Sequence, residues 1–205
     1  LMVKEGLLIK GGSTASAFYA LPSNSDLIIE TIKLRFDRTK IEEHAVFNKL
    51  RDRNNFVRNL PENIQGILFY AFTEMLNNAI EHSKSDNVEI DIRKDKSNII
   101  FIVNDFGIGV FRNVMKQRGL NSEIEAMQDL LKGKTTTQPH SHTGEGIFFT
   151  SKIADIFILE SFEYRLRVDN LISDVFFQEL KPSKKGTRVI FTISNKSGKH
   201  LNDVF

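Results

Sequence analysis

Three polar residues, Glu74, Asn78 and His82, follow one another at four-residue spacing. On a helix this spacing places them on one face, next to a stripe of apolar residues that would pack against a core. The stripe consists of Ile64, Leu68, Ala71, Met75 and Ala79. An Asn amide offers the hard oxygen that Mg²⁺ prefers, and a Glu one turn earlier is placed to hold an attacking water or hydroxyl. We therefore predict that Asn78 is a metal ligand and that Glu74 is catalytic.

A second polar site follows a nearly unbroken apolar run over residues 98–104, which predicts a buried strand that ends at Asp105. A carboxylate that a strand delivers into a pocket is able to accept a hydrogen bond from the exocyclic amine of adenine. Gly107 and Gly109 then let the backbone turn tightly and approach a ligand without a Cβ atom in the way. These residues predict a purine pocket at the end of the strand.

A third segment contains Thr143, Gly144 and Gly146, directly before an apolar stretch over residues 147–154. This order predicts a helix that begins at the glycines. The free N–H groups of such a helix start form a ready phosphate site. Together, the three segments predict one nucleotide-binding site.

The 34 residues between Gly109 and Gly144 are long enough to need structure of their own or to form a lid. A capping-box pattern at Ser122 and a terminating Gly133 predict a helix between them. Residues 132–142 are rich in lysine, threonine and histidine, and Lys134 is our candidate for a phosphate contact in this region. A solvated loop is the alternative. The two histidines of this segment do not indicate a metal site, because no third ligand accompanies them.

In order and spacing, the three segments resemble the motifs of the GHKL superfamily of ATP-binding domains, which includes type II topoisomerases, a heat-shock chaperone, histidine kinases and MutL. Residues 74–82 are similar to its N-box, residues 105–109 to its first glycine box and residues 143–146 to its second. The form Glu-x-x-x-Asn-Ala-Ile-x-His is most similar to the anti-sigma-factor serine kinases. Sensor histidine kinases usually have Asn where Glu74 stands. The resemblance covers about residues 60–195.

The resemblance implies an α/β (α+β) Bergerat fold, a two-layer sandwich with a mixed, mostly antiparallel sheet and helices on one face. It implies ATP and Mg²⁺ as cofactors, with the metal at Asn78 and the segment before Gly144 as an ATP lid. Gly186 and Thr187 are similar to a late Gly-Thr pair that supports the adenine pocket in the family, so Thr187 joins the predicted nucleotide-binding residues. For His82 two interpretations stay open, a contact with nucleotide or substrate and a hydrogen bond to a last-turn carbonyl.

The hydrophobic patterns predict a helix over residues 41–59 that leads to Pro61 at the start of the N-box helix. They also predict a short hairpin over residues 7–21. Further strands are expected at residues 28–36, 88–93, 156–161, 164–169, 172–179 and 187–194.

We expect three regions along the chain: an N-terminal segment at 1–40, a GHKL domain at 41–200, and the start of a further region at 201–205. The hairpin resembles the wing of a winged-helix domain, which would place a DNA-binding domain before residue 1; a plain structural hairpin is the alternative. Domain combinations of this type occur in bacterial proteins that also carry a STAS-like domain. We therefore expect the chain to be a fragment of a longer protein.

The composition fits one main core, since 40% of the 205 residues are hydrophobic. The formal charge of +2 is too small to indicate a nucleic-acid partner for this segment. There are no cysteines, which excludes disulfides and thiolate chemistry. No apolar run approaches the about 20 residues of a membrane span, so we expect a soluble, cytoplasmic protein without a membrane partner.

We therefore predict a regulatory or signalling protein that binds Mg-ATP and either hydrolyses it or transfers its γ-phosphate to a protein side chain. A protein partner or phosphoacceptor is expected. His44 lacks the surrounding pattern of a histidine kinase phosphoacceptor. The alternative is a non-catalytic, ATP-gated switch that controls an attached DNA-binding or protein-binding domain and so regulates transcription. Glu74 separates the two, because only hydrolysis or transfer needs its carboxylate.

Overall fold

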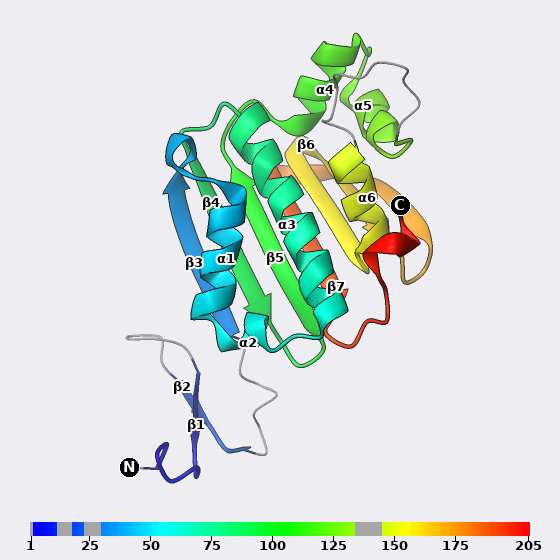
Figure 1. The fold of residues 1–205 in the computed structure, drawn as a ribbon. Coiled ribbons are helices and arrows are strands. Elements are labelled where there is room, and N and C mark those ends of the chain that lie inside the picture. The colour runs from blue at the N-terminus through cyan, green and yellow to red at the C-terminus, as the bar shows by residue number, and fades with distance from the viewer. Residues whose placement is uncertain (1, 12–17, 23–29, 134–144) are drawn as a thin grey trace.

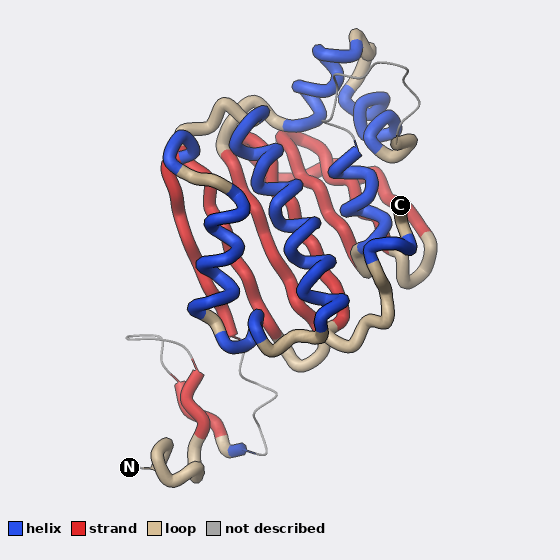
Figure 2. The backbone as a smooth tube through the Cα atoms, viewed as in Figure 1, coloured by secondary structure: helices blue, strands red, loops and turns tan. Residues whose placement is uncertain are grey.

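The computed structural model describes residues 2–11, 18–22, 30–133 and 145–205. Its main body is a two-layer sandwich, in which a five-stranded sheet carries helices α1, α3 and α6 on one face (Figures 1 and 2). The strand order is β3-β4-β5-β7-β6, and each neighbouring pair is antiparallel. The predicted fold class is confirmed, with an entirely antiparallel sheet in place of the mixed one that we expected.

The strands are β1 (Ile9–Gly11), β2 (Phe18–Ala20), β3 (Glu30–Asp37), β4 (Asn87–Lys94), β5 (Asn98–Asp105), β6 (Ile156–Asp169) and β7 (Asp174–Ser194). The α-helices are α1 (Glu43–Arg53), α2 (Asn55–Arg58), α3 (Glu62–His82), α4 (Val110–Arg118), α5 (Glu123–Leu130) and α6 (Glu145–Ile153). Two short 3₁₀ helices, η3 (Arg38–Lys40) and η5 (Leu201–Asp203), complete the regular structure of the described residues.

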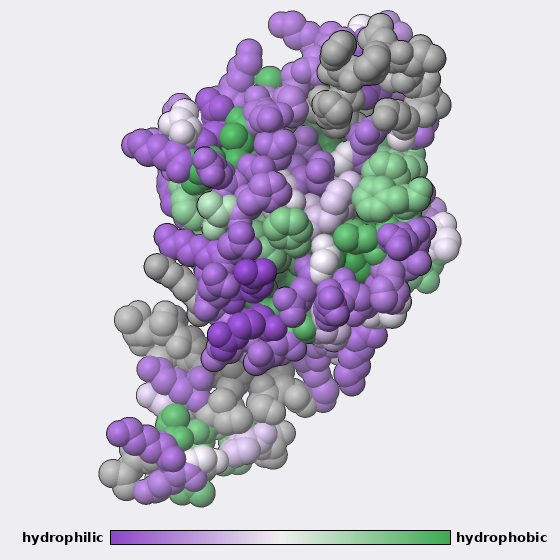
Figure 3. All heavy atoms as spheres, viewed as in Figure 1, coloured by the Kyte–Doolittle hydropathy of each residue, from purple (hydrophilic) through white to green (hydrophobic). Residues whose placement is uncertain are grey.

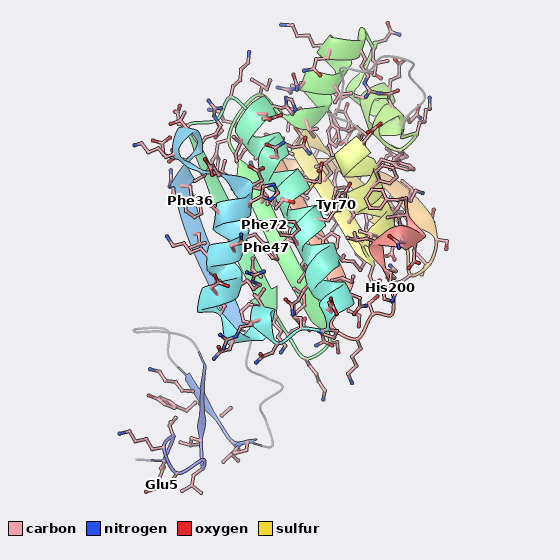
Figure 4. All side chains as sticks on the ribbon, viewed as in Figure 1. Glu5, Phe36, Phe47, Tyr70, Phe72 and His200 are labelled. Atoms are coloured by element: carbon pink, nitrogen blue, oxygen red, sulfur yellow. The ribbon has the colours of Figure 1, made fainter. Side chains whose placement is uncertain are left out.

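Helix α3 is the central helix of the layer, and its predicted apolar stripe from Ile64 to Ala79 is buried against the sheet. Three aromatic rings link this helix to the sheet. Phe72 of α3 meets Phe101 of β5 edge-on at 5.7 Å between ring centroids, and Phe101 stacks on Phe191 of β7 at 4.8 Å. Figure 4 shows Phe72 and Phe47 between the helices and the sheet. This packing holds the polar face of α3 in a fixed orientation.

The predicted helix over residues 41–59 is wrong in its continuity, because the chain breaks into α1 and α2 at Asn54. Asn54 has extended backbone angles, and its side-chain amide donates to the Leu50 carbonyl oxygen at 2.7 Å. An Asn that bonds a carbonyl of the preceding turn competes with helix continuation. Both helices still place apolar residues in the core.

The predicted antiparallel pair of strands before Asp105 is confirmed as β4 and β5. Their turn is closed by the Asp95 carboxylate, which accepts from the N–H groups of Ser97 at 2.8 Å and Asn98 at 2.7 Å. Alternate residues of β5 are buried, and the strand ends with the buried pair Asn104 and Asp105. The strand therefore delivers Asp105 to the end of the sheet.

The four strands predicted between residues 156 and 194 are two long strands, β6 and β7. The pairing register shifts on both sides of Phe162, and the expected strand start at Ile172 lies in the turn between the two strands. The turn of this hairpin is joined to α6, because the Asn170 side chain donates to the Ser151 carbonyl oxygen at 2.7 Å. A β-bulge interrupts the pairing register without ending a strand, so the break expected after Ser161 is a bulge within β6.

The predicted N-terminal hairpin is present as β1 and β2, which pair with each other in a separate two-stranded sheet. Strand β3 lies within the expected N-terminal segment 1–40, but it pairs with β4 along eight residues and forms one edge of the main sheet. Arg38, just after β3, donates to the Ile80 carbonyl oxygen of α3 at 2.7 Å. Strand β3 therefore belongs to the main sheet.

No helix in the described parts of the chain is both long enough and apolar enough to cross a membrane.

Candidate nucleotide site

A cavity lies between α3, the sheet and the first turns of α4 and α6. Much of its wall is apolar, with a small number of polar side chains. It is lined by Met75, Asn78, Ala79, His82, Ser83, Val103, Asp105, Gly109, Val110, Asn113, Ile147, Leu159, Thr187 and Val189. A cavity of this composition suits a flat, mostly apolar ring that carries a polar edge.

Asp105 supplies the buried carboxylate of this cavity. Its Oδ1 accepts from the N–H groups of Gly107 at 2.9 Å and Thr187 at 3.1 Å. Burial raises the pKa of Asp105, although these two hydrogen bonds and the nearby Lys184 ammonium act in the opposite direction. The carboxylate is therefore held in place by the backbone and is a strong acceptor for a donor inside the cavity.

Gly107 and Gly109 lie where the chain passes from β5 to α4. A Cβ atom on Gly107 would stand 1.7 Å from the Ser83 carbonyl oxygen at the end of α3. That same carbonyl accepts from the Ile108 N–H at 2.8 Å. Gly109 has a φ of +80° and lines the cavity. The glycines therefore let the loop pass directly against α3, which closes this end of the cavity.

Thr187 of strand β7 lines the cavity and hydrogen-bonds both Asp105 and the start of α4. Its backbone N–H bonds the Asp105 carboxylate, and its Oγ1 accepts from the Val110 N–H at 3.0 Å. Val110 is the first residue of α4, where helix N–H groups have no partner within the helix. Thr187 therefore fixes the relative position of Asp105 and α4.

Asn78 lines the cavity, while Glu74 lies one turn earlier on α3 and outside its lining. The carboxylate of Glu74 contacts Gly146 in the first turn of α6, because a Cβ on Gly146 would stand 2.1 Å from Glu74 Oε2. A helix N-terminus favours a negative charge. The structure thus brings Glu74 and Gly146 together, and each lies close along its helix to a residue that lines the cavity, Asn78 on α3 and Ile147 on α6.

His82 also lines the cavity, and its Nε2 lies 3.7 Å from Glu81 Oε2. Both of its predicted interpretations stay open. The predicted residues Lys134, Thr143 and Gly144 lie outside the described residues, as does the histidine pair at 140 and 142. Within the described residues, no group of three or more His, Cys, Asp or Glu side chains is arranged to hold a metal ion. This finding does not test Asn78 as a Mg²⁺ ligand, because Asn78 would bind the metal through an amide oxygen.

Asn113 lines the cavity but was not among the predicted site residues. It lies in the first turn of α4, where its N–H donates to the Gly109 carbonyl oxygen at 3.0 Å. The sequence does carry a signal for this helix, since Phe111 and Val114 are three residues apart, both are buried, and Gly119 ends the helix. Recognising α4 would have indicated Asn113 as a candidate.

The family model described as "Histidine kinase-, DNA gyrase B-, and HSP90-like ATPase" matches residues 63–197, about two thirds of the chain. The matched range contains the whole cavity lining. No curated protein matches the chain significantly.

Proposed function

Because this chain belongs to the family of histidine kinase-, DNA gyrase B- and HSP90-like ATPases, which bind ATP, we propose that it binds Mg-ATP in the cavity below α3 and either hydrolyses ATP or transfers its γ-phosphate to a protein side chain. One observation carries the proposal: Asp105 and Asn78 line a single cavity, and Glu74 lies one turn before Asn78 on α3, against the start of α6.

The adenine would bind at the Asp105 end of the cavity. The carboxylate accepts from the exocyclic amine, while the apolar walls formed by residues such as Met75, Val103 and Ile147 cover the ring faces. Asp105 cannot move freely toward or away from the ring, because two backbone N–H groups fix its Oδ1. This arrangement would select a purine that presents an amine over one that presents a carbonyl oxygen.

Asn78 would hold Mg²⁺ through its amide oxygen, with waters and phosphate oxygens completing the octahedral shell. The metal would neutralise negative charge on the phosphates during transfer. On the protein side, the N–H groups at the start of α6 favour negative charge and are proposed to contribute to phosphate binding. Lys134, Thr143 and Gly144 are proposed to add donors to the phosphates from the lid.

Glu74 would orient and deprotonate the attacking group. Its carboxylate is fixed against Gly146 at the start of α6, so its position is set by the same helix that would receive the phosphates. If the attacking group is water, the protein is an ATPase; if it is a protein hydroxyl, the protein is a serine kinase of the anti-sigma-factor type. The proposed setting is a cytoplasmic, bacterial signalling or transcription-regulating protein with a protein partner.

The test follows γ-labelled ATP with Mg²⁺ on the wild type and on Glu74→Gln, and separates free phosphate from labelled protein. We expect turnover in the wild type and a loss of at least about 100-fold in the variant, since general acid–base catalysis contributes that much or more. Glu62→Gln is the matched control, because Glu62 is exposed in the first turn of the same helix. Equal turnover in wild type and Glu74→Gln would refute the catalytic role.

The alternative is an ATP-gated switch without useful turnover. It is favoured by the hairpin of β1 and β2, which forms a sheet of its own, as the wing of a winged-helix domain would. The same assay decides between the two functions. ATP that stays intact while bound to both wild type and Glu74→Gln would support the switch.

A further inference from the structure

The segment after β7 crosses the beginning of α3 and the end of α6. The Asn63 side chain donates to the Ser197 carbonyl oxygen at 2.9 Å and to the Lys199 carbonyl oxygen at 3.0 Å. Lys199 Nζ in turn donates to the Ala154 carbonyl oxygen at 2.8 Å and to Asp155 Oδ1 at 2.7 Å, just after α6. We call residues 195–205 the C-terminal strap. It is held on both helices by hydrogen bonds.

The last residue of the strap, Phe205, lies between the two helices. Its ring meets Tyr70 of α3 edge-on, with ring centroids 5.2 Å apart, and it meets Phe149 of α6 at 4.8 Å. Phe205 is 67% exposed, so these ring contacts form at the surface. Figure 3 shows a hydrophobic patch over α6 on this face, and Figure 4 shows Tyr70 on the side of α3 that faces α6.

Tyr70 precedes Glu74 by four residues and therefore lies on the same face of α3. Glu145 is the first residue of α6, next to the Gly146 that contacts the Glu74 carboxylate. Burial and the charges of Glu74 and Glu145 raise the pKa of Tyr70 to about 12. The phenol of Tyr70 therefore stays neutral, and it shares the face of α3 that carries the carboxylate of the proposed chemistry.

We propose that Tyr70 is a positioning residue for Glu74 and that Phe205 fixes the Tyr70 ring, so that the C-terminal strap sets the rate of phosphate transfer. This inference rests on the proposed function of Glu74. Neither Tyr70 nor Phe205 lines the cavity, so their effect falls on the chemical step and leaves ATP binding unchanged. A partner or a downstream segment that displaces Phe205 would slow turnover without competing with ATP.

The experiment measures kcat, KM and the Kd for Mg-ATP on the wild type, Tyr70→Phe, Phe205→Ala and Phe205→Tyr. Tyr70→Phe and Phe205→Ala are expected to lower kcat by about tenfold or more, since a displacement of a catalytic group by about 1 Å is enough for losses of up to 100-fold. The Kd is expected to stay within about twofold. Phe205→Tyr keeps the ring and is expected to retain wild-type kcat.

Phe69→Ala is the matched control, because Phe69 is an exposed ring on α3 that contacts Phe47 and His44. Its kcat is expected to match the wild type. An unchanged kcat in both Tyr70→Phe and Phe205→Ala would overturn the inference. So would equal losses of kcat and ATP affinity in all ring-deleting variants, because this outcome indicates general unfolding.

A second measurement separates this inference from the proposed function. With ¹³Cζ-labelled tyrosine, the titration of Tyr70 is followed by NMR in wild type, Glu74→Gln and Phe205→Ala. Both substitutions are expected to lower the Tyr70 pKa from about 12, the first by removing a negative charge and the second by admitting water. An unshifted Tyr70 pKa in both variants refutes the proposed influence of Glu74 and Phe205 on Tyr70. Absence of turnover in the wild type, with a shifted Tyr70, refutes the proposed function alone.

Discussion

The substitution Asp105→Asn is expected to weaken nucleotide binding without weakening the fold, because it changes only one of the two carboxylate oxygens. The Asn side chain keeps Oδ1, which accepts from the backbone N–H groups of Gly107 and Thr187, and it replaces the other carboxylate oxygen by an NH₂ group. The group that would face the exocyclic amine of adenine therefore changes from a hydrogen-bond acceptor to a donor. Rotation of the amide restores the acceptor only by abandoning both backbone hydrogen bonds.

The binding loss follows from two contributions. A hydrogen bond to a charged group contributes about 1.5–3 kcal/mol, and a buried donor left without an acceptor costs about 1–3 kcal/mol. The two contributions overlap, so we expect about 3 kcal/mol, which corresponds to an ATP affinity about 100-fold weaker. Isothermal titration calorimetry with Mg-ATP measures this directly.

Stability is expected to respond in the opposite way. Because burial raises the pKa of Asp105, the folded protein holds this proton to higher pH than the unfolded chain does. The ionised carboxylate therefore destabilises the folded state progressively as the pH rises from the ordinary Asp value of about 3.9 through the folded-state pKa. Asp105→Asn removes this term, so near neutral pH the free energy of unfolding is expected to equal or exceed that of the wild type.

The control is Asp105→Ala, which leaves both backbone N–H groups without their acceptor and is expected to lower stability as well as affinity. Urea unfolding at pH 4 and pH 7 completes the test. An Asp105→Asn variant that binds Mg-ATP as tightly as the wild type would refute the adenine contact. A variant that unfolds at distinctly lower urea concentration at pH 7 would refute the reasoning on burial.

Two further substitutions test how the cavity is built. Gly107→Ala is expected to destabilise the fold by about 1–3 kcal/mol, because its Cβ meets the Ser83 carbonyl oxygen. Gly198→Ala is its control, since there is open space around the new Cβ, and the free energy of unfolding is expected to change by no more than about 0.5 kcal/mol in urea unfolding. Thr187→Val leaves the Val110 N–H without its acceptor and is expected to cost about 1–3 kcal/mol, whereas Thr187→Ser keeps the hydroxyl and most of the stability. Equal stability of each pair in thermal unfolding would contradict the contacts assigned to Gly107 and Thr187.

Much of the helix layer and the centre of the sheet were predictable from the sequence, because burial imposes a local period. The stripe from Ile64 to Ala79 repeats every three to four residues, and the run before Asp105 is apolar, so α3 and β5 could be recognised without knowledge of their partners. Where local polarity and tertiary pairing disagreed, the prediction failed. Four separate strands were expected between residues 156 and 194, but pairing across the hairpin carries β6 and β7 through the register shifts at Phe162.

The chemical types of the site residues and their order along the chain were set by the sequence alone. Asn78, Asp105 and the glycines around them indicate a nucleotide site through the chemistry of each residue type, whatever the fold. The sequence also determined that α3 presents Glu74 and Asn78 on one face, since a helix fixes the direction of residues four apart.

Only the tertiary structure decided which distant groups meet. Thr187 bonds Asp105 across 82 positions of the chain, Gly146 meets the Glu74 carboxylate, and Phe205 packs on Tyr70. None of these contacts follows from local periodicity, because each depends on how the sheet order and the helix packing return the chain to the same place. The physical reason is that burial patterns specify which side of an element faces inward, whereas the partner on the other side is chosen by the packing of the whole domain.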